Sequence, residues 1–269
     1  MTKLPFGEVL SESFGFFFAN LRLFFHLVTI PWIASLAIRV IGGMLAHDSL
    51  AAVLIEKALD AVPTVMFMVA WQRAVLLGPG RVDRLPGLGW SPRESAYLVH
   101  LVKIAGITFV LIAAFIFTIG TLDPETIGMG VPVDPEAARR QAMAAPIGAG
   151  FTISLLLALR VSFGLAATAV DVPFSPRLSW AYSRGNAWTI IGALFLTFFV
   201  GALATTAASL VALGLMRGML GADSAAVLVT WLVAILVSYA GAGLAATVQA
   251  VIFRRLLAWR EGAPLPALS

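Results

Sequence analysis

RVSFGLAATAVDVPFSPRLSWAYSRGNAW, residues 160–188, is the stretch around which this chain is organised. An apolar helix is predicted to end in it, the chain turns at residues 171–173 (Asp-Val-Pro), and a new helix begins at residues 175–177 (Ser-Pro-Arg). The six residues SPRLSW at 175–180 have an earlier counterpart in SPRESA at 91–96. This near-duplication predicts that the chain repeats one structural unit.

The composition indicates a membrane protein. Of the 269 residues, 60% are hydrophobic and 12% are charged, and the mean hydropathy is +0.95. A soluble globular protein carries about 25% charged residues, so this composition and the long apolar runs predict a polytopic membrane protein. The absence of cysteine excludes disulfides and thiolate chemistry. We expect no cleavable signal peptide, because Glu8, Glu12 and Arg22 interrupt the first apolar run.

Six apolar segments predict six membrane spans in one integral membrane domain, residues 1–269, and the predicted fold class is an all-α helical bundle. The predicted spans cover about 22–45, 49–78 (with a short apolar core at 61–77), 97–120, 147–170, 187–216 and 225–257.

Three further features predict details of the helices: a proline in the first span, the segment before it, and the longest polar loop. Pro31 predicts a kink in the first span. Residues 5–21 have helical apolar spacing, which suits either a short interfacial helix or an extension of the first span. In the polar loop 121–146, residues 134–136 (Asp-Pro-Glu) predict the start of a short helix.

The spans group into three predicted hairpins, at about 5–80, 90–170 and 175–260, each preceded by an interfacial helix. Pro5, Pro92 and Pro176 open these three helices. At the second of them, Ser91 is the predicted N-cap, and Glu94 is placed to complete a capping box.

Basic residues set the predicted orientation. Of the 18 Lys and Arg residues, five are predicted to lie on the side opposite the N-terminus. These five are Arg39, Lys57, Arg139, Arg140 and Arg217. The positive-inside rule therefore predicts that both termini are cytoplasmic. With the abundance of Ala, Gly and Arg, we expect the inner (plasma) membrane of a bacterium.

The basic residues also form the candidate binding site. Arg93 and His100 are seven residues apart, as are Arg177 and Arg184, and this spacing predicts one helix face for each pair. Such a basic cytoplasmic layer would bind anionic membrane lipid or a membrane protein partner. The alternative is ordinary positive-inside anchoring by arginines that snorkel to the interface. The candidate residues are Arg73, Arg93, His100, Arg160, Arg177, Trp180, Arg184, Trp188 and Arg254.

No arrangement of residues predicts catalysis. We expect no cofactor, no nucleic-acid binding and no metal site, since His26, His47 and His100 form no pair with a second ligand at helical spacing. Glu56 and Asp60 share a helix face, but a cation or proton path would need them at membrane depth, and they are expected at the outer edge. The outer acidic residues are expected to cap short helices or stay solvated rather than hold a cation. They are Asp123, Glu125, Asp134 and Glu136.

Small residues recur at four-residue spacing in the last three predicted spans. They predict close helix contacts, and hence a compact bundle rather than a wide pore. Examples are Gly150/Ser154, Gly164/Thr168, Gly201/Thr205/Ser209 and Gly241/Ala245.

Arg160, Asp171, SPRLSW at 175–180 and SRGNAW at 183–188 together resemble a pattern in a bacterial group of six-span inner-membrane proteins. That group is related to the membrane domain that precedes some glycerophosphodiester phosphodiesterases. The resemblance implies an all-helical integral membrane domain with no established activity of its own. The catalytic barrel needs about 250 further residues, and no His-Arg-Gly or Glu-Asn-Thr stretch is present, so the hydrolase activity is not implied.

Two functional hypotheses follow. The first is a non-catalytic inner-membrane protein whose basic face binds anionic lipid or a partner. The second is a small transporter or lipid-handling protein, motivated by the prolines and the internal repeat. A mid-membrane cavity lined by Arg73, Arg160 or Glu56 would favour the second hypothesis, and a dry bundle would favour the first.

Overall fold

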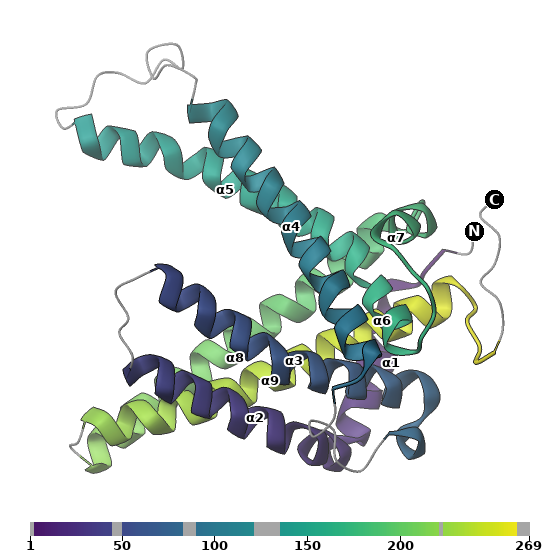
Figure 1. The fold of residues 1–269 in the computed structure, drawn as a ribbon, viewed down its shortest axis with the longest axis horizontal. Helices are drawn as coiled ribbons and strands as arrows, with labels where there is room; N and C mark the ends of the chain where they lie inside the picture. The colour runs from purple at the N-terminus through teal and green to yellow at the C-terminus, as the bar shows by residue number, and fades with distance from the viewer. Residues whose placement is uncertain (1–2, 45–49, 83–89, 121–134, 221–222, 263–269) are drawn as a thin grey trace.

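The computed structural model describes residues 3–44, 50–82, 90–120, 135–220 and 223–262, and these ranges are helical without any strand (Figure 1). The all-α prediction is therefore confirmed for the described residues. The elements are α1 (Phe6–Ala19), α2 (Leu21–Met44), α3 (Leu50–Leu77), the short 3-10 helix η1 (Pro79–Arg81), α4 (Pro92–Gly120), α5 (Pro135–Ser162), α6 (Gly164–Ala169), α7 (Pro176–Tyr182), α8 (Ala187–Leu220) and α9 (Asp223–Leu256).

Five segments of the described chain are long and apolar enough to cross a membrane. They are Leu21–Gly43, Pro92–Ala114, Gly150–Ala169, Ala187–Gly218 and Ala225–Leu256. The expected second span in α3 is not among them. Glu56, Lys57, Asp60 and Arg73 leave this helix only a short uninterrupted apolar run. The six-span count and the three-hairpin repeat therefore stay predictions.

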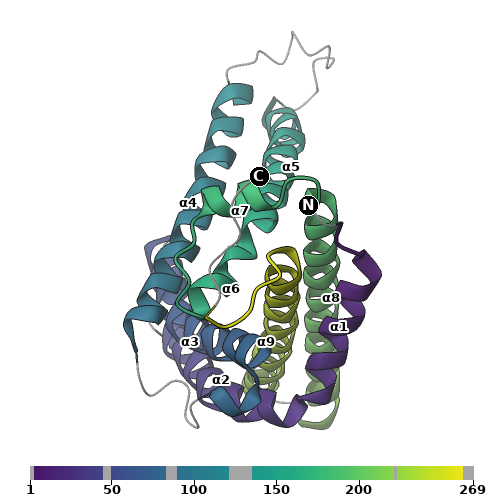
Figure 2. The same ribbon diagram turned by 90° about the vertical axis from the view of Figure 1, so that its right-hand side faces the viewer.

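The long helices pack in consecutive pairs, α2 with α3, α4 with α5, and α8 with α9. Figures 1 and 2 show the α4–α5 pair diverging from the other two pairs toward one end of the bundle. At the opposite end lie α1, α6 and α7. We call this the basic end.

The three segments expected to be interfacial helices differ from one another. The chain turns at Asn20 (φ −115°, ψ 29°), so α1 is a separate helix and not an extension of α2. By contrast, α4 runs unbroken from Pro92 into the apolar segment, which corrects the expected separate helix there. Its capping box is confirmed, because the Ser91 N–H donates to Glu94 Oε2 over 2.9 Å.

α7 is a separate helix, as predicted, but it ends at Tyr182. Arg184 lies in the following turn, where Gly185 adopts φ +80°. Arg177 and Arg184 therefore do not share a helix face. The prediction was wrong because α7 ends two residues before Arg184, so the seven-residue spacing is not completed within one helix.

α5 and α6 depart from the predicted fourth span. α5 already begins at Pro135, so the expected short helix is the first part of a 28-residue helix. It ends at Ser162, and the chain resumes as the short α6. Acidic residues of the expected outer cluster (Asp123, Glu125 and Asp134) and His47 lie outside the described residues.

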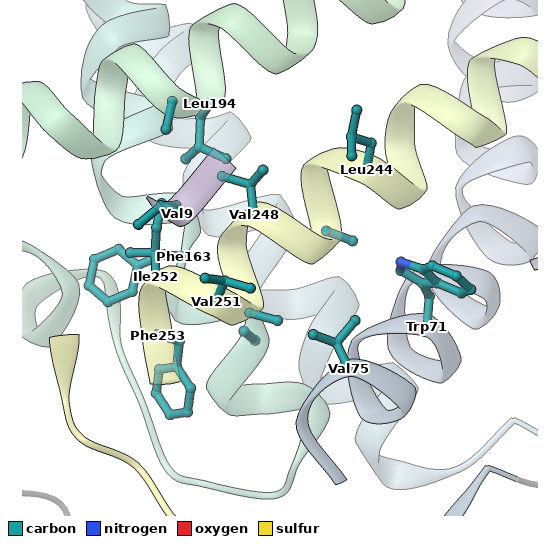
Figure 3. Close-up of a cluster of buried hydrophobic side chains, with 14 of the residues drawn as sticks. Val9, Trp71, Val75, Phe163, Leu194, Leu244, Val248, Val251, Ile252 and Phe253 are labelled. Atoms are coloured by element: carbon teal, nitrogen blue, oxygen red, sulfur yellow. The ribbon is translucent and has the colours of Figure 1, made fainter. Parts of the chain in front are cut away.

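The core surrounds the second half of α9 (Figure 3). Its side chains from Val248 to Phe253 are almost fully buried, in contact with α1, α3, α6 and α8. Because neighbours cover this part of the helix on every side, it is apolar around most of its circumference.

α8 and α9 approach closely at the predicted small residues. A Cβ built on Gly201 or on Gly241 would lie 3.3 Å from the Cα of the other glycine. Because glycine has no side chain, the two backbones can come this near, and a Cβ at either position would make a tight contact. The expected close contact between these two helices is confirmed.

Candidate interface at the basic end

Two predicted arginines converge on one carboxylate at the basic end. Arg93 of α4 donates to both oxygens of Asp171, from Nε over 2.9 Å and from Nη2 over 2.7 Å. Arg73 of α3 lies 3.7 Å from the same carboxylate and donates to the Ala169 carbonyl over 3.2 Å. Asp171 itself has φ +61°, a left-handed conformation that Asp tolerates better than most residues. The turn after α6 thus links α3 and α4.

We expect Asp171→Asn to reduce the free energy of unfolding by about 1 kcal/mol. The variant keeps a residue that tolerates the left-handed backbone, but it removes the charge from a bidentate pair. Asp171 is 58% exposed, which keeps the expected loss small. Thermal unfolding in mild detergent measures it, and a double-mutant cycle with Arg93→Gln isolates the pair. A coupling energy of zero would contradict this role.

Arg93 and His100 line the same hollow of about 420 Å³ beside α6, so their predicted common face is confirmed. The Nδ1 atom of His100 lies 3.1 Å from Thr168 Oγ1. Lys103 lines the hollow on the next turn of α4. A second hollow of about 460 Å³ lies beside it, lined by Arg73, and Asp171 borders both.

Arg160, near the end of α5, is held by α7. Its Nε donates to Ser183 Oγ over 2.8 Å, and its guanidinium carbon lies 3.5 Å from the centre of the Trp180 ring. This is close cation–π stacking. The structure therefore brings together two predicted site residues that are 20 positions apart in the sequence. Among the described contacts of Arg160 there is no carboxylate.

Arg254, in contrast, is occupied within the protein. It pairs with Glu12 of α1, and its neighbour Arg255 donates to Glu12 Oε2 and to Glu8 Oε2, both over 2.7 Å. These pairs fasten α1 along the end of α9. The structure thus places Arg254 in an internal ion-pair network, which accounts for it without any external ligand.

The remaining predicted residues are turned outward. Arg177 and Arg184 are exposed, as are Trp180 and Trp188, whose exposed fractions are 40% and 79%. Neither arginine has an ion pair with a described carboxylate. We call the group of Arg160, Arg177, Trp180, Arg184 and Trp188 the α7 face.

The sequence analysis did not predict the carboxylates that pair with Arg254 and Arg255. Glu8 and Glu12 are four residues apart on α1, which could have predicted a paired basic site such as Arg254 and Arg255. It also missed Asn186, whose Oδ1 accepts the Leu4 N–H over 2.8 Å and fixes the start of the chain beside α8.

The fold and its apolar segments are those of a multi-pass helical membrane protein. No family model matches the chain, and neither a curated protein nor a solved structure matches it. The resemblance to the membrane domain of glycerophosphodiester phosphodiesterases therefore stays a prediction.

Proposed function

We propose that this protein is a non-catalytic, multi-pass membrane protein that binds anionic lipid headgroups through the α7 face. One observation carries the proposal. Three arginines without a carboxylate partner among the described residues stand beside two exposed tryptophans. The other three predicted arginines, Arg73, Arg93 and Arg254, contact carboxylates of the protein itself.

The chemistry of the α7 face favours lipid over a protein partner. Arginine forms bidentate hydrogen bonds to phosphate, and tryptophan is enriched at the headgroup level of membranes. The stacked Trp180 ring also holds the guanidinium of Arg160 in place, which reduces the entropy lost on binding. In this proposal the basic end is cytoplasmic, in the inner membrane of a bacterium, where anionic lipids create a negative surface potential.

We expect Arg177→Glu/Arg184→Glu to lose the anionic lipid that the wild type retains. Each basic residue near an anionic membrane surface adds about 1 kcal/mol to the binding free energy. The loss of two positive charges, without counting the added negative ones, therefore weakens lipid binding about thirtyfold. Mass spectrometry of lipids retained through mild-detergent purification, normalised to the bulk lipid, measures the change.

The matched control is Arg22→Glu/Arg260→Glu, which changes the net charge equally at two exposed arginines outside the α7 face. Retention of selective anionic lipid in the control and its loss in the test variant supports the proposal. Equal loss in both variants, or bulk-like lipid already in the wild type, contradicts it, and the search then turns to protein partners.

A further inference from the structure

A second site lies away from the α7 face, among α2, α3, α8 and α9. Here a cavity of about 260 Å³ extends from Arg39 and Trp231, toward the far ends of the helices, to Thr205 and Tyr239, near the middle of α8 and α9. It lies between the end of the bundle opposite the basic end and the bundle's midpoint. The other lining residues are Lys57, Asp60, Thr64, Ala234, Ile235, Ser238 and Ala242.

Asp60 is the least satisfied polar group of this cavity. Its Oδ1 atom is shielded from solvent and accepts no hydrogen bond from any described residue. A carboxylate oxygen without a donor is unfavourable inside an apolar bundle. The Oδ1 atom of Asp60 can therefore accept a donor that the described part of the protein does not supply.

Two cations at the cavity share a single carboxylate. Arg39 Nη1 and Lys57 Nζ lie 3.4 Å and 3.5 Å from the same oxygen, Oε1 of Glu56. One carboxylate thus pairs with two cations, while Asp60 forms no ion pair with a described residue. The four side chains sum to zero charge, but one positive and one negative charge remain uncompensated at different depths. Arg39 and Lys57 are 44% and 56% exposed, so a ligand can reach them.

The inner wall is polar and well fixed. The Tyr239 hydroxyl lies 2.8 Å from Ser35 Oγ and 3.5 Å from Thr64 Oγ1, so three helices hold it in place. On the other side, the Arg39 guanidinium lies 5.7 Å from the centre of the Trp231 ring. The polar groups of the cavity are therefore positioned before any ligand binds, which favours specific recognition.

We propose that this cavity binds a small zwitterion, with its ammonium group on Asp60 and its anionic group on the exposed sides of Arg39 and Lys57 that do not face Glu56. A zwitterion satisfies both uncompensated charges without adding net charge to the bundle. Two sources carry this chemistry, namely free amino acids and the headgroup of an ethanolamine phospholipid. The cavity is small enough to select a ligand of few atoms.

The test uses the purified wild type in nanodiscs of phosphatidylglycerol. Each standard amino acid and O-phosphoethanolamine is titrated in turn while the unfolding temperature is recorded. Any compound that raises it is compared with an analogue that lacks the ammonium, such as L-lactate for L-alanine. In a second arm the nanodiscs also contain phosphatidylethanolamine, and native mass spectrometry records whether it is retained above its bulk fraction.

We expect a zwitterion to raise the unfolding temperature, its analogue without ammonium to have no effect, and Asp60→Asn to weaken binding about tenfold or more. Glu261→Gln is the matched control, since Glu261 forms an exposed pair with Arg81 at the basic end, away from this cavity. Stabilisation by an amino acid identifies a free ligand, whereas selective retention of phosphatidylethanolamine identifies the lipid.

Should Asp60→Asn fail to fold, Lys57→Gln tests the anionic side of the same cavity and is expected to weaken binding as well. The proposal is overturned if no amino acid or headgroup probe raises the unfolding temperature and phosphatidylethanolamine is not enriched. Binding that is unchanged in both Asp60→Asn and Lys57→Gln also overturns it.

Discussion

Trp71→Ala is expected to lower the free energy of unfolding by about 4 kcal/mol, the largest effect among the substitutions considered. Trp71 has no exposed surface, and its ring centre lies 5.6–6.2 Å from those of Phe16, Phe17, Phe24 and Phe67. The truncation leaves a cavity at the contact of α1, α2 and α3. Equilibrium unfolding followed by circular dichroism in mild detergent measures the change.

Trp71 also donates from Nε1 to Thr247 Oγ1 over 2.8 Å, which connects α3 to α9. Trp71→Phe keeps most of the ring and removes this donor, so it is expected to cost about 1 kcal/mol. Trp188→Ala removes the same kind of side chain at 79% exposure and is expected to leave stability nearly unchanged. If Trp71→Ala were no more destabilising than Trp188→Ala, the aromatic cluster would not be part of the stabilising core.

Gly164→Ala is expected to destabilise the protein by about 2 kcal/mol, because there is no space for even one methyl group. A Cβ at Gly164 would lie 2.8 Å from Phe174 Cδ1 and would overlap Ser179 Oγ. Gly164 begins α6, and this contact fixes the turn that carries Asp171 against α7. Thermal unfolding of the purified variant measures the loss.

Two controls make this expectation specific. Gly106→Ala places a methyl group in open space within α4, and alanine is the better helix former, so stability should rise by up to about 1 kcal/mol. Ser179→Ala combined with Gly164→Ala removes one of the two clashing groups and should restore part of the stability. Equal effects of Gly164→Ala and Gly106→Ala would contradict the close packing of α6 against α7.

Local sequence determined the class of structure. Apolar runs and the scarcity of charge predicted an all-helical chain with several segments able to cross a membrane, and the described residues agree. Residue types at helix starts were equally informative, since Ser91 and Glu94 form the predicted capping box and Pro176 begins α7. The glycines predicted to permit close contact did so at Gly201 and Gly241. Each of these features depends on neighbouring residues within one helix or on a glycine that lacks a side chain. Both can be read from the sequence without knowledge of the tertiary structure.

The candidate site was predicted only in part. Arg93 and His100 share a face because α4 is continuous, whereas Arg177 and Arg184 do not because α7 already ends at Tyr182. Arg160 and Trp180 were both predicted site residues, but their stacking depends on how α7 folds back over the end of α5. Seven-residue spacing is informative only while one helix persists.

The tertiary structure alone decided which arginines are available. Arg93 meets Asp171 across 78 residues of sequence, and Arg254 meets Glu12 across 242. Arg177 and Arg184, of the same residue type, are left facing outward. Composition counts these cations equally, but pairing depends on which distant helix packs beside each one, and that is set by burial of the apolar surface of α9 and its neighbours. The same packing placed Asp60 on a cavity at the other end of the bundle, where the sequence showed only a charged stretch ahead of a short apolar run.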